Sequence, residues 1–323
     1  MEQHSVPISI KGSTVMVDAV VIRDRTVAVT GTWFRAARFY EEEWQTGNPL
    51  ADIDAFITSL RGAQPKPDIF SFSPGLEFLH QKFPFRSEPE DAAVVQLSSF
   101  DLWWESLPQE ARKNVRRSER RGLTVRAAAF DDLLVSGIKK LYDETPVRQG
   151  RRFWHYGKDV QTIRAENSSF VERSEFIGAY FNDELIGFIK VVYVGKVARI
   201  MQILSANAHY DKRPANALLA KAIEISCHKG MSYFVYGRYF YGNKGDTPIT
   251  EFKRRNGFER IIVPRYFVPL TAKGRLILAL NLHQGVKNLI PRPIINSLLD
   301  IRSRVYSILP RHGNSGSAPV AAT

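Results

Sequence analysis

Cysteine is almost absent from this chain of 323 residues, in which only Cys227 is present. A disulfide framework within one chain is therefore excluded, and a zinc site built from cysteine ligands is strongly disfavoured. A reducing cytoplasm is the compartment that fits this composition best. Because Cys227 lies in an apolar helical stretch, we interpret it as a small buried hydrophobe rather than as a nucleophile.

Long apolar stretches are lacking as well. The first twelve residues contain no basic region followed by an apolar segment, so no signal peptide is predicted. The longest apolar run near the C-terminus, residues 276–280, is far too short to cross a bilayer. We expect a cytoplasmic protein. It is either soluble or bound peripherally at the inner face of the membrane.

Signatures of several common enzyme classes are missing. The chain has no glycine pattern of the Walker or Rossmann type, and no G-x-S-x-G element of the serine hydrolases. Its histidines are scattered, and no set of histidine, aspartate and glutamate has the spacing of metal ligands. The sequence therefore predicts no metal site.

Positive charge is present in excess, but it is local. The net charge is +12, with 24% charged residues in a chain that is 44% hydrophobic. Residues 111–126 contain seven basic side chains and one acid, and residues 271–323 contain the same numbers. These two segments account for the whole net charge, so the sequence predicts anionic partners at two places rather than a generally basic protein.

A cationic helix is predicted over residues 107–121. Pro108 suits a first helical position, and Gly122 suits the residue just after the end. The basic side chains form two adjacent i,i+4 rows on one face, where like charges repel one another. Two interpretations stay open: a solvated helix face and an anion-binding helix. The six residues are Arg112, Lys113, Arg116, Arg117, Arg120 and Arg121.

The order of predicted elements is clearest after Gly122. Apolar periodicity and turn residues predict a strand, two helices, three antiparallel strands, a long helix, a strand, a helix and a strand. Their ranges are 123–130, 131–142, 157–169, 175–181, 184–194, 196–204, 214–229, 232–236, 248–255 and 260–268. Before Gly122 we predict strands over 14–22, 26–34, 68–72 and 92–97 and helices over 35–45 and 51–61; after residue 271 we predict helices over 273–284 and 293–309.

Three segments carry a resemblance to a known family. RKNVRRSERRGLTVR (Arg112–Arg126) is similar to the helix, ending in glycine, that leads into the second lobe of FemAB-like transferases. RPANALLAKAIEISCHKG (Arg213–Gly230) looks like the family's long helix, and FKRRNGFE (Phe252–Glu259) matches its late FK…GF element. The chain from about residue 103 to residue 270 therefore resembles the GNAT-type acyltransferases, in their FemAB-like and CelD-like branches.

The resemblance implies an α/β fold with a mixed sheet and a division into three parts. Residues 1–110 would be a degenerate first GNAT-like lobe, residues 111–270 a complete GNAT acyltransferase domain, and residues 271–323 a basic amphipathic helical tail with a disordered end.

The resemblance also implies a reaction. An acyl group would pass from a thioester, acyl-CoA or acetyl-CoA, to an amine on a small molecule, a sugar, or a cell-envelope or polysaccharide precursor. One alternative is an aminoacyl-tRNA-dependent ligase of FemAB type, whose tRNA phosphates would require a cationic face. Another is a non-catalytic binding module. The basic tail would suit contact with an anionic membrane.

In this family the donor pyrophosphate lies at the N-terminus of the long helix, where backbone N–H groups point outward. The residues carried over by the resemblance as donor-binding are Lys212, Arg213, Ala215, Asn216 and Ala217. The family's glycine-containing loop is missing here, and Pro214 removes one N–H group. This departure favours the FemAB-like branch over an ordinary CoA-binding GNAT protein.

Two polar-aromatic clusters are candidates for the chemistry. The loop over residues 148–156 would cover the acceptor, with His155 either as a general base or as part of a packed aromatic cluster. Its predicted substrate-binding residues are Arg148, Gln149, Arg152, Phe153, Trp154 and Tyr156. The cluster over residues 236–246 would supply a tyrosine that protonates the leaving group. Its candidates are Tyr236, Tyr239 and Tyr241, with Arg238 as a further substrate-binding residue.

Overall fold

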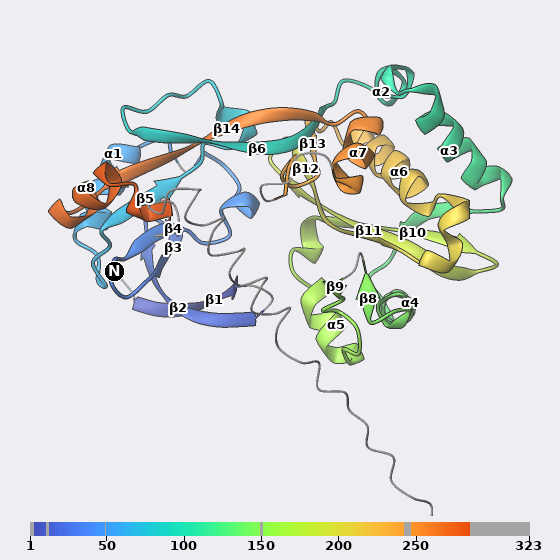
Figure 1. The fold of residues 1–323 in the computed structure, drawn as a ribbon, viewed down its shortest axis with the longest axis horizontal. Helices are drawn as coiled ribbons and strands as arrows, with labels where there is room; N and C mark the ends of the chain where they lie inside the picture. Colours follow the sequence, from blue (N-terminus) through green and yellow to red (C-terminus); the bar gives the residue numbers. More distant parts are fainter. Residues whose placement is uncertain (1–2, 11–12, 49, 149–150, 242–246, 285–323) are drawn as a thin grey trace, which may run out of the picture.

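The computed structural model describes residues 3–10, 13–48, 50–148, 151–241 and 247–284 (Figure 1). In these residues one mixed sheet of twelve strands extends through both halves of the molecule, in the order β1-β2-β3-β4-β5-β14-β6-β13-β12-β11-β10-β7. Helices cover it mainly in the half that contains the later strands, so the predicted α/β mixed fold is confirmed.

The two halves of the sheet repeat one pattern of strands. In each half, four strands pair antiparallel in chain order, a fifth strand joins the fourth in parallel, and a helix connects these two. In the first half these elements are β1 (Gln3–Ile10), β2 (Ser13–Ile22), β3 (Arg25–Thr30), β4 (Ala36–Phe39), α1 (Ile53–Arg61) and β5 (Ile69–Phe72). In the second half they are β7 (Thr124–Ala128), β10 (Ser174–Phe181), β11 (Glu184–Val194), β12 (Val197–Ser205), α6 (Pro214–His228) and β13 (Tyr233–Val235).

Two long strands join the halves. β6 (Arg86–Gln96) pairs with β13 of the second half, and β14 (Glu259–Pro269) pairs with β5 of the first half. β6 and β14 also pair with each other along most of their length. The sheet therefore continues across the predicted boundary near residue 110.

The first half of the sheet with its helix, called the first lobe below, is a reduced version of the second half, called the second lobe. In the second lobe α4 (Asp132–Asp143) and α5 (Val160–Asn167) stand between β7 and β10, whereas only two residues separate β1 from β2. Figure 1 places α4 and α5 on one face of the second lobe's strands, and α6 with α3 (Gln109–Arg120) on the other. β11 is buried along nearly its whole length because helices cover both of its faces.

Each lobe has its own hydrophobic core. The larger core packs α4, α6 and the central strands of the second lobe around residues such as Ile138, Phe188 and Leu219. The smaller core packs α1 against the first lobe's strands around Phe56, Phe70 and Phe72. Among the described residues, no helix is long and apolar enough to cross a membrane.

Most predicted elements of the second lobe are confirmed within a few residues, and α7 (Pro248–Arg255) has the predicted bounds. The helix predicted over 35–45 is wrong. Its first part is β4, and its later part contains only the short 3₁₀ turn η1 (Glu42–Trp44). Alanine, arginine and glutamate favour a helix locally, but pairing with β3 and β5 overrides that propensity.

Several short elements were not predicted. They are β1, α2 (Phe100–Ser106), the two-residue strands β8 (Val147–Arg148) and β9 (Arg151–Arg152), and the 3₁₀ turns η2 (Leu76–Phe78), η3 (Val171–Arg173) and η4 (Asn207–Lys212). The helix predicted over 273–284 is α8 (Ala272–Ala279) followed by η5 (Leu282–Gln284), and it packs on the first lobe. The helix predicted over 293–309 lies outside the described residues.

Candidate functional site

The parallel strands β12 and β13 separate soon after they meet. Only three residue pairs join them, Val197–Arg199 with Tyr233–Val235. After Val235 the backbone leaves β12 but stays beside β6, where the N–H of Tyr236 donates to the carbonyl oxygen of Ala93 at 2.9 Å. In the described chain no strand pairs with residues 200–205 on this side of β12, so backbone groups along that edge lack a strand partner.

A β-bulge lies on β12 directly after the last shared pair. Lys190 of β11 is opposite Gln202 and Val191 is opposite Ile200, so Met201 has no partner on β11. A bulge of this kind turns the backbone and side chains of a strand locally, and bulges are frequent beside active sites. The bulge and the strand divergence therefore mark the same short stretch as a candidate active site.

A cavity of about 810 Å³ lies beside the bulge. Side chains of β12, α4, α5 and the loop between these helices line it, together with one residue of β2 from the first lobe. The lining residues are Thr14, Tyr142, Arg152, Trp154, His155, Lys158, Glu166, Asn167, Met201 and Gln202. Three residues predicted for the acceptor loop, Arg152, Trp154 and His155, are thus brought together at one cavity.

A chain of polar contacts runs along the wall of this cavity. The hydroxyl of buried Tyr142 lies 3.0 Å from Oε1 and 2.8 Å from Nε2 of Gln202. Nε2 of Gln202 is 3.4 Å from Nε2 of His155. The His155 ring packs between Tyr142 and Trp154, with centroid distances of 4.2 and 3.9 Å. The loop is held down by this aromatic cluster, which Phe153 joins.

His155 is neutral at physiological pH. Burial lowers its pKa to about 4, and the ammonium of Lys158 acts in the same direction. Glu166 lies 3.7 Å from Nδ1 of His155, but the same carboxylate is held by Lys158, so it does little to favour the imidazolium. A neutral imidazole can accept a hydrogen bond or a proton from a ligand in the cavity.

The Arg148 side chain forms hydrogen bonds and an ion pair beneath this loop. Its guanidinium donates to the carbonyl oxygen of Ser205 at 3.0 Å and to Glu144 at 2.7 Å. The Glu144 carboxylate in turn accepts from the N–H groups of Asn207 and Ala208, each at 2.9 Å. These contacts fix the start of the β12–α6 loop. Tyr156 is exposed outside the cavity lining, and Gln149 lies outside the described residues.

On the β13 side of the divergence lies a buried lysine, Lys253 of α7. Its Nζ donates to the carbonyl oxygen of Arg238 and lies 4.7 and 4.3 Å from the ring centroids of Tyr236 and Tyr241. Burial lowers the pKa of Lys253 to about 8. An ammonium with this pKa gives up its proton more readily than an exposed lysine does.

The three candidate tyrosines have different surroundings. Tyr236 packs against Phe252 and Phe258, and burial raises its pKa. Burial also raises the pKa of Tyr241, which is partly exposed. The N–H of Tyr239 donates to Asp91 at 3.2 Å, and its ring packs on Phe240. Residues 242–246 of this predicted cluster lie outside the described chain.

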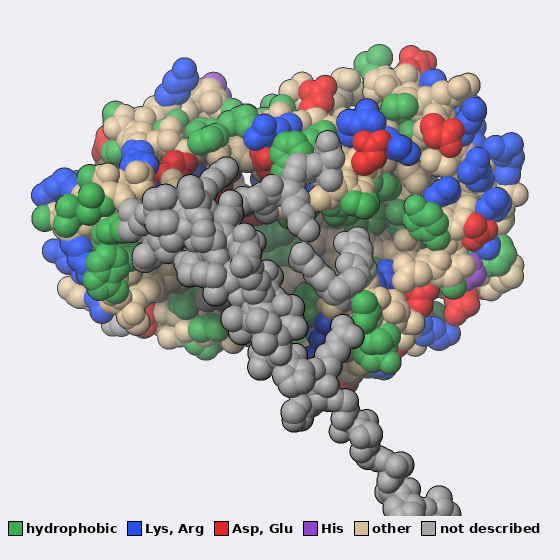
Figure 2. All heavy atoms as spheres, viewed as in Figure 1, with side chains coloured by type: hydrophobic (Ala, Val, Ile, Leu, Met, Phe, Trp, Pro, Cys, Tyr) green, Lys and Arg blue, Asp and Glu red, His purple; other side chains and the backbone are tan. Residues whose placement is uncertain are grey.

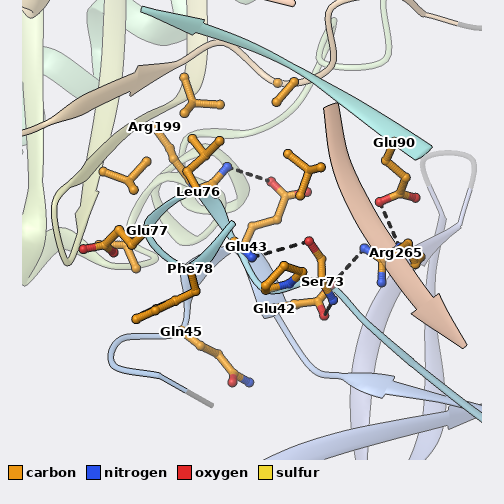
Figure 3. Close-up of a pocket in the computed structure, with 18 of the residues that line it drawn as sticks. Glu42, Glu43, Gln45, Ser73, Leu76, Glu77, Phe78, Glu90, Arg199 and Arg265 are labelled. Atoms are coloured by element: carbon orange, nitrogen blue, oxygen red, sulfur yellow. Dashed lines mark hydrogen bonds and ion pairs between the residues drawn. The ribbon is translucent and has the colours of Figure 1, made fainter. Parts of the chain in front are cut away.

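A second, smaller cavity of about 240 Å³ opens between the lobes (Figure 3). Arg199 and Val235, the last pair joining β12 and β13, both line it, so it adjoins the divergence from the side of the first lobe. Figure 3 shows Glu42 and Glu90 directed at Arg265, at 2.9 and 2.8 Å.

The charges in this smaller cavity are largely paired. Burial raises the pKa of Glu42, against the effect of Arg265. The predicted substrate-binding residue Arg238 also lines the cavity, and its exposed side chain pairs with Glu90 at 3.3 Å.

The predicted donor residues surround the N-terminus of α6. Arg213 takes the left-handed conformation, with φ 56°, immediately before Pro214. The backbone thus makes the turn that a glycine usually provides, although no glycine is present. Lys212 lies 4.4 Å from the ring centroid of Phe181, and Asn216 donates to Asn256 of α7 at 3.2 Å. Ala217 is buried and Ala215 is partly buried in the first turn.

The cationic helix α3 packs beside α6. Its end reaches the loop directly before α6, which contains the predicted donor residues Lys212 and Arg213 and is called the donor loop below. Arg121, just after α3, contacts Asp211 at 2.8 Å. Within the described chain the other five basic residues form no ion pair; they are Arg112, Lys113, Arg116, Arg117 and Arg120. Figure 2 shows lysine and arginine side chains gathered along the right-hand edge, where Figure 1 places α3. No group of three potential metal ligands occurs among the described residues.

Comparison with solved structures agrees with this architecture. The crystal structure of FemX is similar with a TM-score of 0.54 and 11% identity, over 86% of this chain and 90% of that chain. A putative lysylphosphatidylglycerol synthetase from Agrobacterium fabrum has a C-terminal domain (DUF2156) with a TM-score of 0.51 and 16% identity, over 81% of this chain and 87% of that chain. The chain has the GNAT fold.

The GNAT fold occurs here with two lobes that share one sheet, and the similarity to FemX extends over 86% of the chain. The PaiA N-acetyltransferase from Thermoplasma acidophilum, solved in complex with coenzyme A, matches 45% of this chain and 98% of its own, with 15% identity and a TM-score of 0.32. No protein-family model and no curated protein sequence matches the chain.

Several residues of the candidate site were not predicted from the sequence. Lys253 lies within the FK…GF element that was singled out, and its place in the motif was the available signal. Tyr142, Gln202 and Met201 gave no signal, because each lies in an ordinary helix or strand. Only the strand register brings Met201 and Gln202 to the divergence.

Proposed function

We propose that this protein is an N-acyltransferase whose reaction takes place where β12 and β13 diverge. The donor would be a thioester such as acyl-CoA or acetyl-CoA, and the acceptor an amine. The observation that carries the proposal is the unpaired edge of β12 beside the 810 Å³ cavity. The GNAT fold supports it, since the solved structures that resemble this chain are mostly transferases.

The transfer forms a C–N bond and breaks the C–S bond of the thioester. The uncharged amine attacks the carbonyl carbon, and negative charge develops on the carbonyl oxygen. A backbone N–H on the free edge of Met201–Ser205 would donate to that oxygen, which is the kind of pre-oriented donor that stabilises such a transition state most. The amine then loses a proton to a base or to solvent, and the leaving thiolate gains one.

Lys253 is the residue that we assign to the leaving group. At neutral pH its ammonium is mostly protonated, and a pKa of about 8 suits proton donation near that pH. Tyr236 and Tyr241 would hold the ammonium through their rings rather than act as acids themselves. In this proposal the predicted catalytic tyrosines become positioning residues.

The acceptor amine would approach through the larger cavity. His155 and Gln202 would accept hydrogen bonds from it, and His155 would be the first base for its proton. Trp154 and Arg152, both exposed at the cavity, would contact the remainder of the acceptor. A small molecule, a sugar, or a cell-envelope or polysaccharide precursor bearing an amine would meet these requirements.

The donor would lie with its phosphates at the N-terminus of α6. The turn at Arg213 keeps the backbone in the required left-handed conformation, and Lys212, Arg213 and Arg121 supply positive charge nearby. Asp211 offsets part of that charge, and Pro214 contributes no N–H group. This arrangement favours a donor whose phosphates bind to cationic side chains more than to backbone N–H groups.

An aminoacyl-tRNA donor is the second candidate. The specific observation in its favour is a set of five arginine and lysine side chains on α3 that form no ion pair among the described residues and lead to the donor loop. An RNA backbone would neutralise such a row and release counterions. In both cases the protein would work in the cytoplasm, and the basic segment after residue 271 would favour peripheral contact with an anionic membrane.

Donor binding tests the proposal directly. The thermal stability of the full chain would be measured with acetyl-CoA, longer acyl-CoAs and charged tRNA at fixed salt. A ligand at a hundred times its dissociation constant stabilises the fold by about 2.7 kcal/mol. Stabilisation by a thioester supports the first function, and stabilisation by charged but not uncharged tRNA supports the second. Failure of every donor would contradict both and leave a non-catalytic module.

A further inference from the structure

Helix α8 presents two different sides. Gly274, Ile277 and Leu278 are buried against the first lobe, where Ile69 of β5 and Phe267 of β14 complete a small apolar cluster. On the opposite side Leu276 and Leu280 follow one another at i,i+4, and they are 59% and 50% exposed. The helix is thus anchored by one side and leaves two leucines in solvent on the other.

Trp33 extends this exposed apolar side. It is 61% exposed, and its ring packs edge-on against Phe34, which packs on the same apolar cluster. Nζ of Lys273 donates to the carbonyl oxygen of Trp33 and lies 5.4 Å from the centroid of its ring. Through Lys273, which lies one helical turn before Leu276, Trp33 is joined to the exposed side of α8.

Cations surround the three apolar side chains. Lys273 and Arg275 flank the leucines on α8, and Arg35 follows Trp33 by two residues and is exposed. The nearby acid Asp68 is mostly buried and is engaged by Lys273 at 3.9 Å, by the Arg35 N–H at 3.0 Å and by the Thr271 hydroxyl at 2.8 Å. We call this surface the α8 patch; it comprises Trp33, Arg35, Lys273, Arg275, Leu276 and Leu280.

We propose that the α8 patch docks the protein on an anionic lipid bilayer. Exposed leucines beside tryptophan enter the boundary between head groups and acyl chains, while a surrounding ring of lysine and arginine meets anionic head groups. Figure 2 shows this alternation of apolar and basic side chains at the left-hand edge, where Figure 1 places α8. The patch lies at the end of the molecule opposite α3.

The chain beyond the described residues agrees with this partner. The segment over residues 285–323 continues from η5, directly after α8, and contains five basic residues and one acid. Positive charge therefore continues from the patch into the next part of the sequence. Each basic residue near the bilayer surface raises the partition coefficient of a protein onto an anionic bilayer about fivefold.

Co-sedimentation of the full chain with vesicles tests the proposal. We expect binding to vesicles of phosphatidylcholine mixed with phosphatidylglycerol, and much weaker binding to phosphatidylcholine alone. Leu276→Ser with Leu280→Ser should weaken binding at least about tenfold. Lys273→Ala with Arg275→Ala should weaken it by a similar factor on the anionic vesicles only.

The matched control is Leu133→Ser, which removes a leucine that is 82% exposed on α4. This variant should bind vesicles as the wild type does. The proposal is overturned if the wild type binds neither vesicle, or if both patch variants bind as tightly as the wild type. The second outcome would be expected if residues 285–323 alone met the membrane or if they covered the patch.

Discussion

Replacing His155 with glutamine should remove a specific sensitivity of the fold to acid. The imidazole has a pKa of about 4 in the folded protein, below the ordinary value of 6.5, because it is buried and faces Lys158. Between these two values the unfolded chain binds one more proton than the native protein. Stability from this group is therefore complete above about pH 6.5 and is lost as the pH falls toward 4.

The size of the effect follows from the two pKa values. Lowering the pH from about 7.5 to about 5 should cost the wild type about 2 kcal/mol of unfolding free energy through His155 alone. The side chain is only 12% exposed, so solvent screening reduces this value little. Glutamine preserves a polar contact with Gln202 but does not titrate in this range.

Urea denaturation at the two pH values gives the required free energies. The loss of stability on acidification should be about 2 kcal/mol smaller in His155→Gln than in the wild type. The control His80→Gln, at an exposed histidine, should behave as the wild type does. An identical pH dependence in wild type and His155→Gln would refute the conclusion that this histidine is buried in its neutral form.

Three further predictions concern other buried charges. Lys253→Met should lower the acyl-transfer rate about 100-fold or more through loss of the proton donor, whereas Lys140→Met, at a lysine that is 69% exposed, should leave it unchanged in the same assay. Lys190 is fully buried and has a pKa of about 8, so the unfolded chain keeps that proton to higher pH than the native protein does. The wild type should therefore gain about 2.5 kcal/mol of unfolding free energy as the pH rises from about 7 to 10, and Lys190→Met should lack this rise in urea denaturation. Glu144→Ala should lower the unfolding free energy by about 1–3 kcal/mol, since the N–H groups of Asn207 and Ala208 lose their acceptor, while Glu184→Ala at an exposed ion pair should stay within about 0.5 kcal/mol.

The second lobe could be predicted almost completely, since its helices and strands carry strong local patterns. The first lobe could be predicted only in part, because its elements depend on pairing over long distances. β4 shows this dependence. Its residues favour a helix, yet they fill the place between β3 and β5. The continuous sheet could not be foreseen either, because β14 crosses into the first lobe from the end of the second.

The part of the candidate site that could be predicted from the sequence is the part whose polar and aromatic side chains are close together in the chain. The loop with Trp154 and His155 could be found from its composition, and it does line a cavity. The partners of His155 could not, since Tyr142 and Gln202 come from α4 and β12. Whether an arginine such as Arg148 is free to bind substrate also depends on tertiary contacts, here with Glu144 and Ser205.

Hydrogen–deuterium exchange with and without a bound donor shows whether the acyl group is transferred at the diverging ends of β12 and β13. A donor that stabilises the full chain should slow exchange in residues 200–205 and in the first turn of α6, and should leave α1 and β2 of the first lobe unchanged. Protection confined to the first lobe, or none on β12, would contradict this account.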